Sequence, residues 1–100
     1  MINYTVNGNI LTVYICGDID HHTAADLRKD IDALIRQNQP VYLILDFSGV
    51  TFCDSSGIAV VLGRYRIMNE AGGEVELIRL PANVRQIFDL AGLQRLVKIG

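Results

Sequence analysis

Two adjacent serines, Ser55 and Ser56, stand where an apolar strand is predicted to pass into a helix. The first backbone N–H groups of a helix have no partner within the helix, and the helix dipole places about half a positive charge at that end. An anion carried by a side chain is therefore stabilised there. Ser55 is accordingly a candidate for carrying a phosphate, and Asp54 or Ser55 is a candidate for capping the helix. The two interpretations do not exclude each other.

Ser56 is a second candidate phosphate acceptor beside Ser55. Its hydroxyl lies one step further into the predicted helix, so we expect it to cap the helix or to pack against neighbouring side chains. The local pattern places Ser55 first and leaves Ser56 as its rival.

A second polar cluster lies between the second predicted strand and the first predicted helix, at Asp18, Asp20, His21 and His22. Carboxylates and imidazoles in one loop can bind a metal ion or form half of a catalytic site. A loop that leads into a helix also favours acidic residues because of the helix dipole alone. The cluster lacks the Cys–His or His–His spacing typical of zinc sites, so we expect no metal site and no cofactor.

A serine hydrolase is the enzymatic alternative for the same residues. Its triad would consist of Ser55 as nucleophile, His21 or His22 as base and Asp20 or Asp54 as the orienting carboxylate. A nucleophile elbow requires glycine two residues before and two residues after the serine. Here Cys53 precedes and Gly57 follows, and 100 residues leave little room for an enclosed pocket. We therefore expect that the protein is not an enzyme.

The chain has 100 residues, of which half are apolar and a fifth are charged, and this composition predicts one compact domain over residues 1–100. A net charge of −2 provides no basic face for nucleic acid. The start of the chain lacks a basic segment followed by an apolar stretch, and the longest apolar runs have five residues. Neither a secretory signal nor a membrane span is predicted, and we expect a cytoplasmic protein.

Two cysteines, Cys16 and Cys53, are far apart in the sequence and have strand-like surroundings. A cysteine in such a place usually behaves as a small hydrophobic residue, which fits a reducing compartment. A regulatory disulfide between the two is the alternative.

Periodicity and turn residues predict five strands and three helices. The strands are expected at residues 2–6, 10–16, 41–45, 74–78 and 96–99, with an Asn-Gly hairpin between the first two. The helices are expected from Thr23 to about Gln37, from Ser55 or Ser56 to Ala71, and from Pro81 to Gly92. Thr23 and Asp26 resemble a capping box, and the apolar run 41–45 predicts a strand covered on both faces. The order β-β-α-β-α-β-α-β predicts an α/β fold with helices packed against a mixed sheet.

Several separated segments agree in order and spacing with one known family. Residues 46–58, which read DFSGVTFCDSSGI, resemble the signature of bacterial anti-sigma-factor antagonists of the STAS domain family. Residues 17–24, which read GDIDHHTA, are similar to the sporulation branch of that family, the branch of stage II sporulation protein AA. Shorter matches at residues 63–65, 72–73 and 87–93 extend the resemblance over nearly the whole chain.

The resemblance implies a STAS-like fold and a protein switch. In that family the anti-sigma factor is also a serine kinase, and it phosphorylates the serine that matches Ser55. The unphosphorylated antagonist binds the anti-sigma factor and frees the sigma factor, and a PP2C-type phosphatase later removes the phosphate. Asp20 matches the aspartate beside the phosphorylation site. The partner surface that the resemblance implies consists of Asp20, Asp54, Ser55, Ser56 and Gly57.

The chain departs mildly from the family pattern. Ala59 stands where glycine is frequent, and Cys53 stands where methionine is common. The sequence ends at Gly100 without the terminal helix of many members, so we expect no contacts from such a helix. The loop 21–23 favours the sporulation branch, and an antagonist in a general-stress or stressosome pathway is the alternative.

Overall fold

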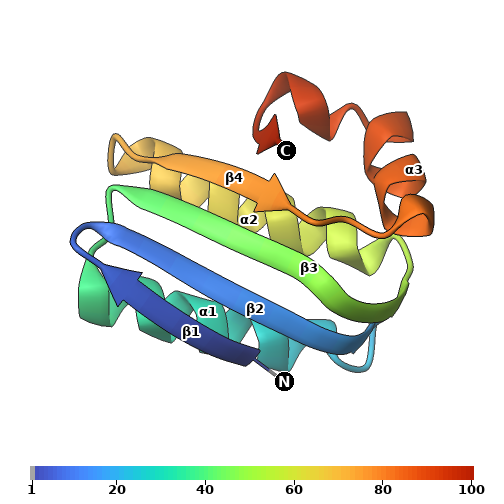
Figure 1. Cartoon of the computed structure of the whole chain (residues 1–100), viewed down its shortest axis with the longest axis horizontal. Helices are drawn as coiled ribbons and strands as arrows, with labels where there is room; N and C mark the ends of the chain where they lie inside the picture. The colour runs from blue at the N-terminus through green and yellow to red at the C-terminus, as the bar shows by residue number, and fades with distance from the viewer. Residues whose placement is uncertain (1) are drawn as a thin grey trace.

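Five strands form one sheet in the computed structural model, which describes residues 2–100 (Figure 1). The strands are β1 (Ile2–Asn7), β2 (Ile10–Ile19), β3 (Tyr42–Cys53), β4 (Glu74–Ile78) and β5 (Lys98–Ile99). The helices are α1 (Ala24–Asn38), α2 (Ser56–Glu70), α3 (Ala82–Leu90) and the short 3₁₀ helix η1 (Leu93–Arg95). The predicted order of strands and α-helices is confirmed.

The sheet is mixed, and its strands follow the order β1-β2-β3-β4-β5. β1 and β2 pair antiparallel through a turn in which Gly8 has a φ of 62°, a conformation that glycine adopts without a steric penalty. The later neighbours are parallel, with a helix in each connection. The carboxyl ends of β2, β3 and β4 therefore lie at the same edge of the sheet, together with the starts of α1, α2 and α3.

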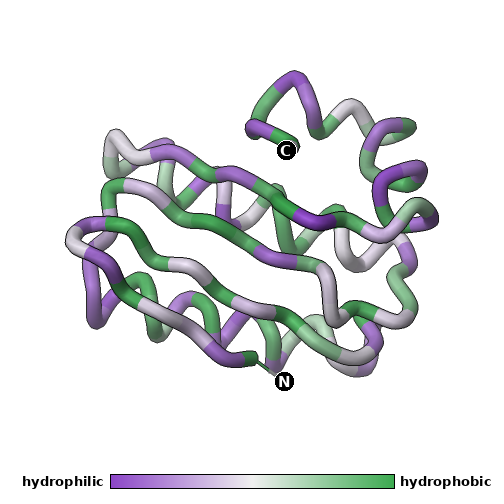
Figure 2. Tube along the Cα trace, in the orientation of Figure 1, coloured by the Kyte–Doolittle hydropathy of each residue, from purple (hydrophilic) through white to green (hydrophobic). Residues whose placement is uncertain are grey.

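Within residues 2–100, α1 and α2 cover the same face of the sheet, behind the strands in Figure 1. In β3, Leu43, Leu45 and Phe47 are buried, whereas Tyr42 and Ile44 at the alternate positions are half-buried. The prediction that this strand is covered on both faces is therefore wrong. The central strands are apolar along much of their length, as Figure 2 shows, because half-buried positions also tolerate apolar side chains.

β2 and β3 continue beyond their predicted ends at residues 16 and 45, to Ile19 and Cys53, which pair with each other. The added segments contain glycines, polar residues and shifts of register, which interrupt the alternation that indicates a strand. The last strand is shorter than the predicted 96–99 and contains only Lys98–Ile99. The extension of β2 and β3 brings their terminal loops side by side.

Asp46 on β3 is a buried carboxylate that Arg79, directly after β4, neutralises. Arg79 donates from Nε at 2.9 Å and from Nη2 at 2.6 Å to Asp46 Oδ2, and the Ser48 N–H donates to Oδ1 at 2.9 Å. Burial raises the pKa of Asp46, but the hydrogen bonds from Arg79 and Ser48 outweigh burial and hold this pKa below its ordinary value. The carboxylate is therefore charged at neutral pH and depends on its partner.

Replacing Arg79 by glutamine is expected to lower the free energy of unfolding at pH 7 by about 1–3 kcal/mol, because the buried charge of Asp46 loses its cation. A depressed folded-state pKa contributes stability above the unfolded pKa of about 4, and this contribution disappears as the pH falls below it. The difference from wild type should therefore shrink between pH 7 and pH 3 in urea unfolding. The exposed Arg66 on α2, changed to glutamine, is the control. If R79Q lost the same free energy of unfolding at pH 7 and at pH 3, Arg79 would not act by neutralising Asp46.

Candidate functional site

The loops after β2 and β3 meet at one edge of the sheet. The Asp54 N–H donates to the Ile19 carbonyl at 3.1 Å, which ties the loop before α2 to the end of β2. Thr51 Oγ1 donates to Asp18 Oδ1 at 2.7 Å and adds a side-chain link to the backbone pairing of the two strands. The two polar clusters that are separate in the sequence therefore belong to one surface.

Asp54, and not Ser55, caps α2 with its side chain. The Ser56 N–H donates to Asp54 Oδ1 at 2.8 Å, and the Gly57 N–H donates to the Asp54 carbonyl at 3.0 Å. Ser55 occupies the N-cap position, but its side chain makes no capping hydrogen bond within residues 2–100. Ser55 is exposed, whereas Ser56 is half-buried. The hydroxyl of Ser55 is thus available to another molecule at the positive end of α2.

Gly57 is buried beneath this surface and allows α2 to approach β3 closely. A Cβ atom at position 57 would overlap Cys53 Sγ and would contact the ring of Phe88. The Phe88 ring in turn packs edge-on against Phe47, with ring centroids 5.5 Å apart. Gly57 therefore contributes to the site by fixing the position of the Ser55 backbone.

Asp20 organises the neighbouring loop. Its Oδ1 accepts hydrogen bonds from the N–H groups of His22 at 2.8 Å and Thr23 at 3.1 Å. These bonds, led by the one from His22, hold the pKa of Asp20 below its ordinary value. Thr23 Oγ1 donates to the Asp18 carbonyl at 2.9 Å, and it makes no capping hydrogen bond to α1 within residues 2–100. The predicted capping box of Thr23 and Asp26 is wrong, because Thr23 is used to close the loop.

The two histidines lie against each other and beside Asp20. The rings of His21 and His22 lie 3.9 Å apart, and His22 Nδ1 lies 3.8 Å from Asp20 Oδ1. Among residues 2–100, Ser55 makes no hydrogen bond with either histidine. The same residues contain no group of three His, Cys, Asp or Glu side chains placed to hold a metal ion.

Cys16 on β2 and Cys53 on β3 lie far apart along the sheet. Cys16 pairs with Gly49, four residues before Cys53, which corresponds to about 13 Å at the rise of a strand. A disulfide requires Cα atoms within about 7 Å, so the alternative of a disulfide between them does not fit this fold. Cys53 is buried, and burial, followed by the nearby charge of Asp54, raises the pKa of its thiol to about 11.

Comparison with known proteins identifies the family. The model of the STAS domain matches residues 1–100. The chain belongs to the STAS domain family. Among its relatives, an anti-sigma F factor antagonist of Paenibacillus polymyxa is 34% identical over 90 residues, which are 90% of this chain and 77% of the relative. An anti-sigma-B factor antagonist of Bacillus subtilis (strain 168) is 30% identical over 93 residues, 93% of this chain and 84% of the relative. The resemblance found in the sequence is confirmed.

Solved STAS structures confirm the predicted fold. The anti-sigma factor antagonist SpoIIAA in its unphosphorylated form superposes with a TM-score of 0.84 and 27% identity, over 100% of this chain and 88% of that chain. The Bacillus cell fate determinant SpoIIAA in its phosphorylated form superposes with a TM-score of 0.76 and 27% identity, over 100% and 91% of the two chains. No helix within residues 2–100 is long and apolar enough to span a membrane.

Sequence reasoning missed two residues that position the candidate site. Thr23 and Thr51 each donate to Asp18, to its carbonyl and its carboxylate respectively. Thr51 lies in the part of β3 whose sequence lacks a strand pattern, so its pairing with β2 is not visible there. Thr23 is a residue type that commonly caps helices and stands at the start of a predicted helix. Its sequence context therefore predicts a helix cap and gives no indication of its hydrogen bond to the Asp18 carbonyl.

Proposed function

We propose that this STAS protein is an anti-sigma factor antagonist whose binding is controlled by phosphorylation of Ser55. In its unphosphorylated form it binds an anti-sigma factor that is also a serine kinase, and it thereby frees the sigma factor. The kinase transfers phosphate to Ser55 and so ends the complex, and a PP2C-type phosphatase restores the binding form. The protein acts in the cytoplasm as a substrate and a binding module, with no catalytic activity of its own.

The exposure of the Ser55 hydroxyl carries this proposal. Because Asp54 supplies the side-chain cap of α2, Ser55 can be modified without loss of a capping bond. A phosphate at this position lies at the positive end of a helix, where its charge is favourable to the domain itself. The effect of phosphorylation must therefore be felt at the partner surface, for which we propose Asp20, Asp54, Ser55 and Ser56, with Gly57 as the buried support.

The charge of the surface supports a switch of this kind. Asp20 is held ionised by backbone N–H groups, and Asp54 lies beside Ser55 with its carboxylate bonded to Ser56. A phosphoserine would add about −1.5 to −2 charges to a surface that is already acidic. A partner that matches the unmodified surface would then face an excess of negative charge at its centre.

Phosphate transfer from ATP tests the proposal directly. We expect a candidate anti-sigma kinase from the same genome to phosphorylate the wild type and Ser56→Ala. Phosphate incorporation into Ser55→Ala should be lower by at least about a hundredfold. Ser56→Ala is the matched control, since it removes the neighbouring hydroxyl. Labelling that persists in S55A and disappears in S56A would assign the site to Ser56. Absence of labelling by every such kinase would overturn the switch.

Two pathways remain as alternatives for the same function. The relatives include antagonists of anti-sigma F factor and of anti-sigma-B factor. We propose the sporulation pathway, since the loop at residues 17–24 favours that branch, and a general-stress or stressosome antagonist is the second candidate. The labelling experiment can be performed with an anti-sigma F kinase and with an anti-sigma-B kinase. The kinase that phosphorylates the protein faster identifies the pathway.

A further inference from the structure

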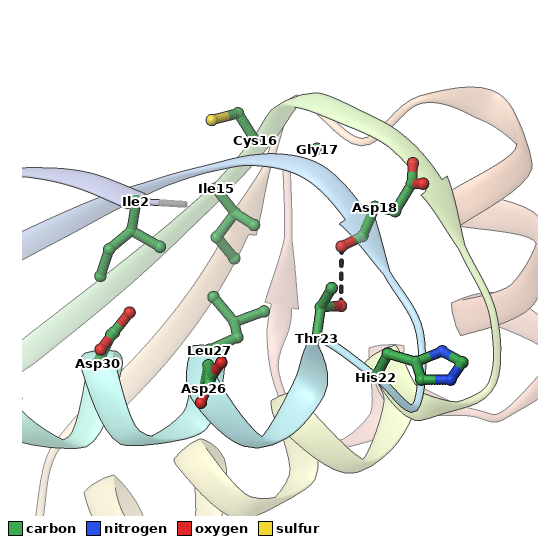
Figure 3. Close-up of a pocket in the computed structure, with 10 residues that line it drawn as sticks. All are labelled: Ile2, Ile15, Cys16, Gly17, Asp18, His22, Thr23, Asp26, Leu27 and Asp30. Carbon is green, nitrogen blue, oxygen red and sulfur yellow. Dashed lines mark hydrogen bonds between the residues drawn. The ribbon is translucent and has the colours of Figure 1, made fainter.

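A cavity of about 470 Å³ lies beside the proposed partner surface, between the β1–β2 hairpin and α1 (Figure 3). Apolar side chains, backbone and carboxylates line it together. Its lining includes the apolar residues Ile2, Ile15 and Leu27 and the acidic residues Asp18, Asp26 and Asp30.

The floor of the cavity is apolar and its rim is acidic. Ile15 and Leu27 are buried, and Ile2 is half-buried. Asp26 and Asp30 are exposed on α1, and Figure 3 shows both carboxylates on the α1 side of the cavity, with Asp30 opposite Ile2. The cavity therefore combines an apolar slot with negative charge at its opening, and none of the described residues that line it is lysine or arginine.

The fold itself does not account for both rim carboxylates. Asp26 lies in the first turn of α1, where the helix dipole favours an acidic residue. Asp30 lies one turn later, and like charges four residues apart destabilise a helix by about 0.2–0.5 kcal/mol. Neither carboxylate forms a salt bridge within the part of the chain that the structure describes. Among residues 2–100, no cation therefore neutralises this pair of carboxylates, and a binding partner can provide one.

We propose that this cavity receives a lysine or arginine side chain of the anti-sigma factor. The aliphatic stem of such a side chain matches the slot of Ile2, Ile15 and Leu27, and its charged head matches the carboxylates of Asp26 and Asp30. This inference rests on the proposed function and names one contact of the partner.

The position of the cavity supports this assignment. His22, Thr23 and Asp18 line it, and the same three residues bond to or surround Asp20 in the proposed partner surface. A partner that covers Asp20 and Ser55 can therefore contact the cavity as part of the same interface. The cavity extends the recognition surface from the start of α2 to the first two turns of α1.

A titration with a small cation tests the cavity without the partner. N-acetyl-argininamide, added to the isotopically labelled protein, should shift the amide resonances of Leu27, Asp30 and their neighbours in a saturable manner. N-acetyl-citrullinamide, which has nearly the same shape and no charge, should shift them at least about fivefold less. Equal shifts with both compounds, or shifts scattered over the surface, would overturn the charge recognition that we propose.

Affinity for the anti-sigma factor tests the role in the complex. The double variant Asp26→Asn/Asp30→Asn should bind the kinase about tenfold more weakly than wild type and with a smaller dependence on salt. The matched control is Glu70→Gln/Glu74→Gln, which removes two exposed charges at the opposite end of the sheet and should stay within about twofold. Circular dichroism melting verifies that both variants fold.

The outcomes separate this inference from the proposed function. Wild-type binding that is lost in Ser55→Asp, but unchanged in D26N/D30N, would keep the proposed function and overturn the role of the cavity. Equal weakening in both double variants would indicate a general charge effect and would also overturn it. Failure of the wild type to bind any anti-sigma factor would overturn the proposed function, and with it the occupant named here.

Discussion

Replacing Ser55 by aspartate is expected to lower the affinity for the anti-sigma factor by at least about a hundredfold and to leave the melting temperature within a few degrees of wild type. Two like charges about 4 Å apart repel by about 4 kcal/mol at an effective dielectric constant of 20, and each 1.4 kcal/mol changes an affinity tenfold. Within the folded domain the same charge is favourable, because it lies at the start of α2. Calorimetric titration and circular dichroism melting measure the two quantities.

The neutral variant Ser55→Asn is the matched control for this effect. Its side chain has nearly the same size as aspartate, and we expect its affinity to stay within about fivefold of wild type. Phosphorylated protein should bind more weakly than S55D, since a phosphoserine carries more charge than an aspartate. If S55N weakened binding as much as S55D, the switch would act by size rather than by charge. A large loss of folded structure in either variant would place the effect inside the domain instead.

The position of Ser55 was predictable because local chemistry alone determines it. An apolar strand, an Asp-Ser-Ser turn and a helix that starts near Gly57 form one continuous signal, and the structure begins α2 at Ser56. Which of the two residues, Asp54 or Ser55, caps α2 with its side chain was not predictable. Both residue types cap helices well, and only the geometry shows which oxygen faces the N–H of Ser56.

The contact between the two loops depends on tertiary pairing that the sequence pattern hides. β2 runs through Gly17 and Asp18, and β3 runs through Ser48 and Gly49. Glycine and polar residues are depleted in strands, so both segments resemble loops when they are taken alone. Pairing between them supplies the hydrogen bonds that overcome this low propensity. The same limitation explains why the role of Thr51 could not be predicted.

Replacing Gly57 by alanine is the second change for which we expect a large effect, a loss of about 1–3 kcal/mol in the free energy of unfolding. In an open part of a helix the same replacement stabilises by about 0.5–1 kcal/mol. At position 57 the new Cβ would overlap Cys53 Sγ, and close-packed interiors do not absorb an added methyl group. Gly63→Ala in the same helix is the control, since a Cβ atom at position 63 would have no such neighbour within 4 Å. Urea unfolding measures both variants.

A second substitution at Cys53 shows whether this overlap is the cause. Cys53 is buried and its pKa is raised to about 11, so the thiol is neutral at pH 7 and acts in packing. In a Cys53→Ala background the sulfur is absent, and Gly57→Ala should then be neutral or stabilising. The coupling energy of the double-mutant cycle should therefore be at least as large as the loss seen in G57A alone. A coupling energy near zero would show that Gly57 is required for its backbone and not for its contact with Cys53. Because this contact sets the start of α2, G57A should also weaken partner binding, whereas G63A should not.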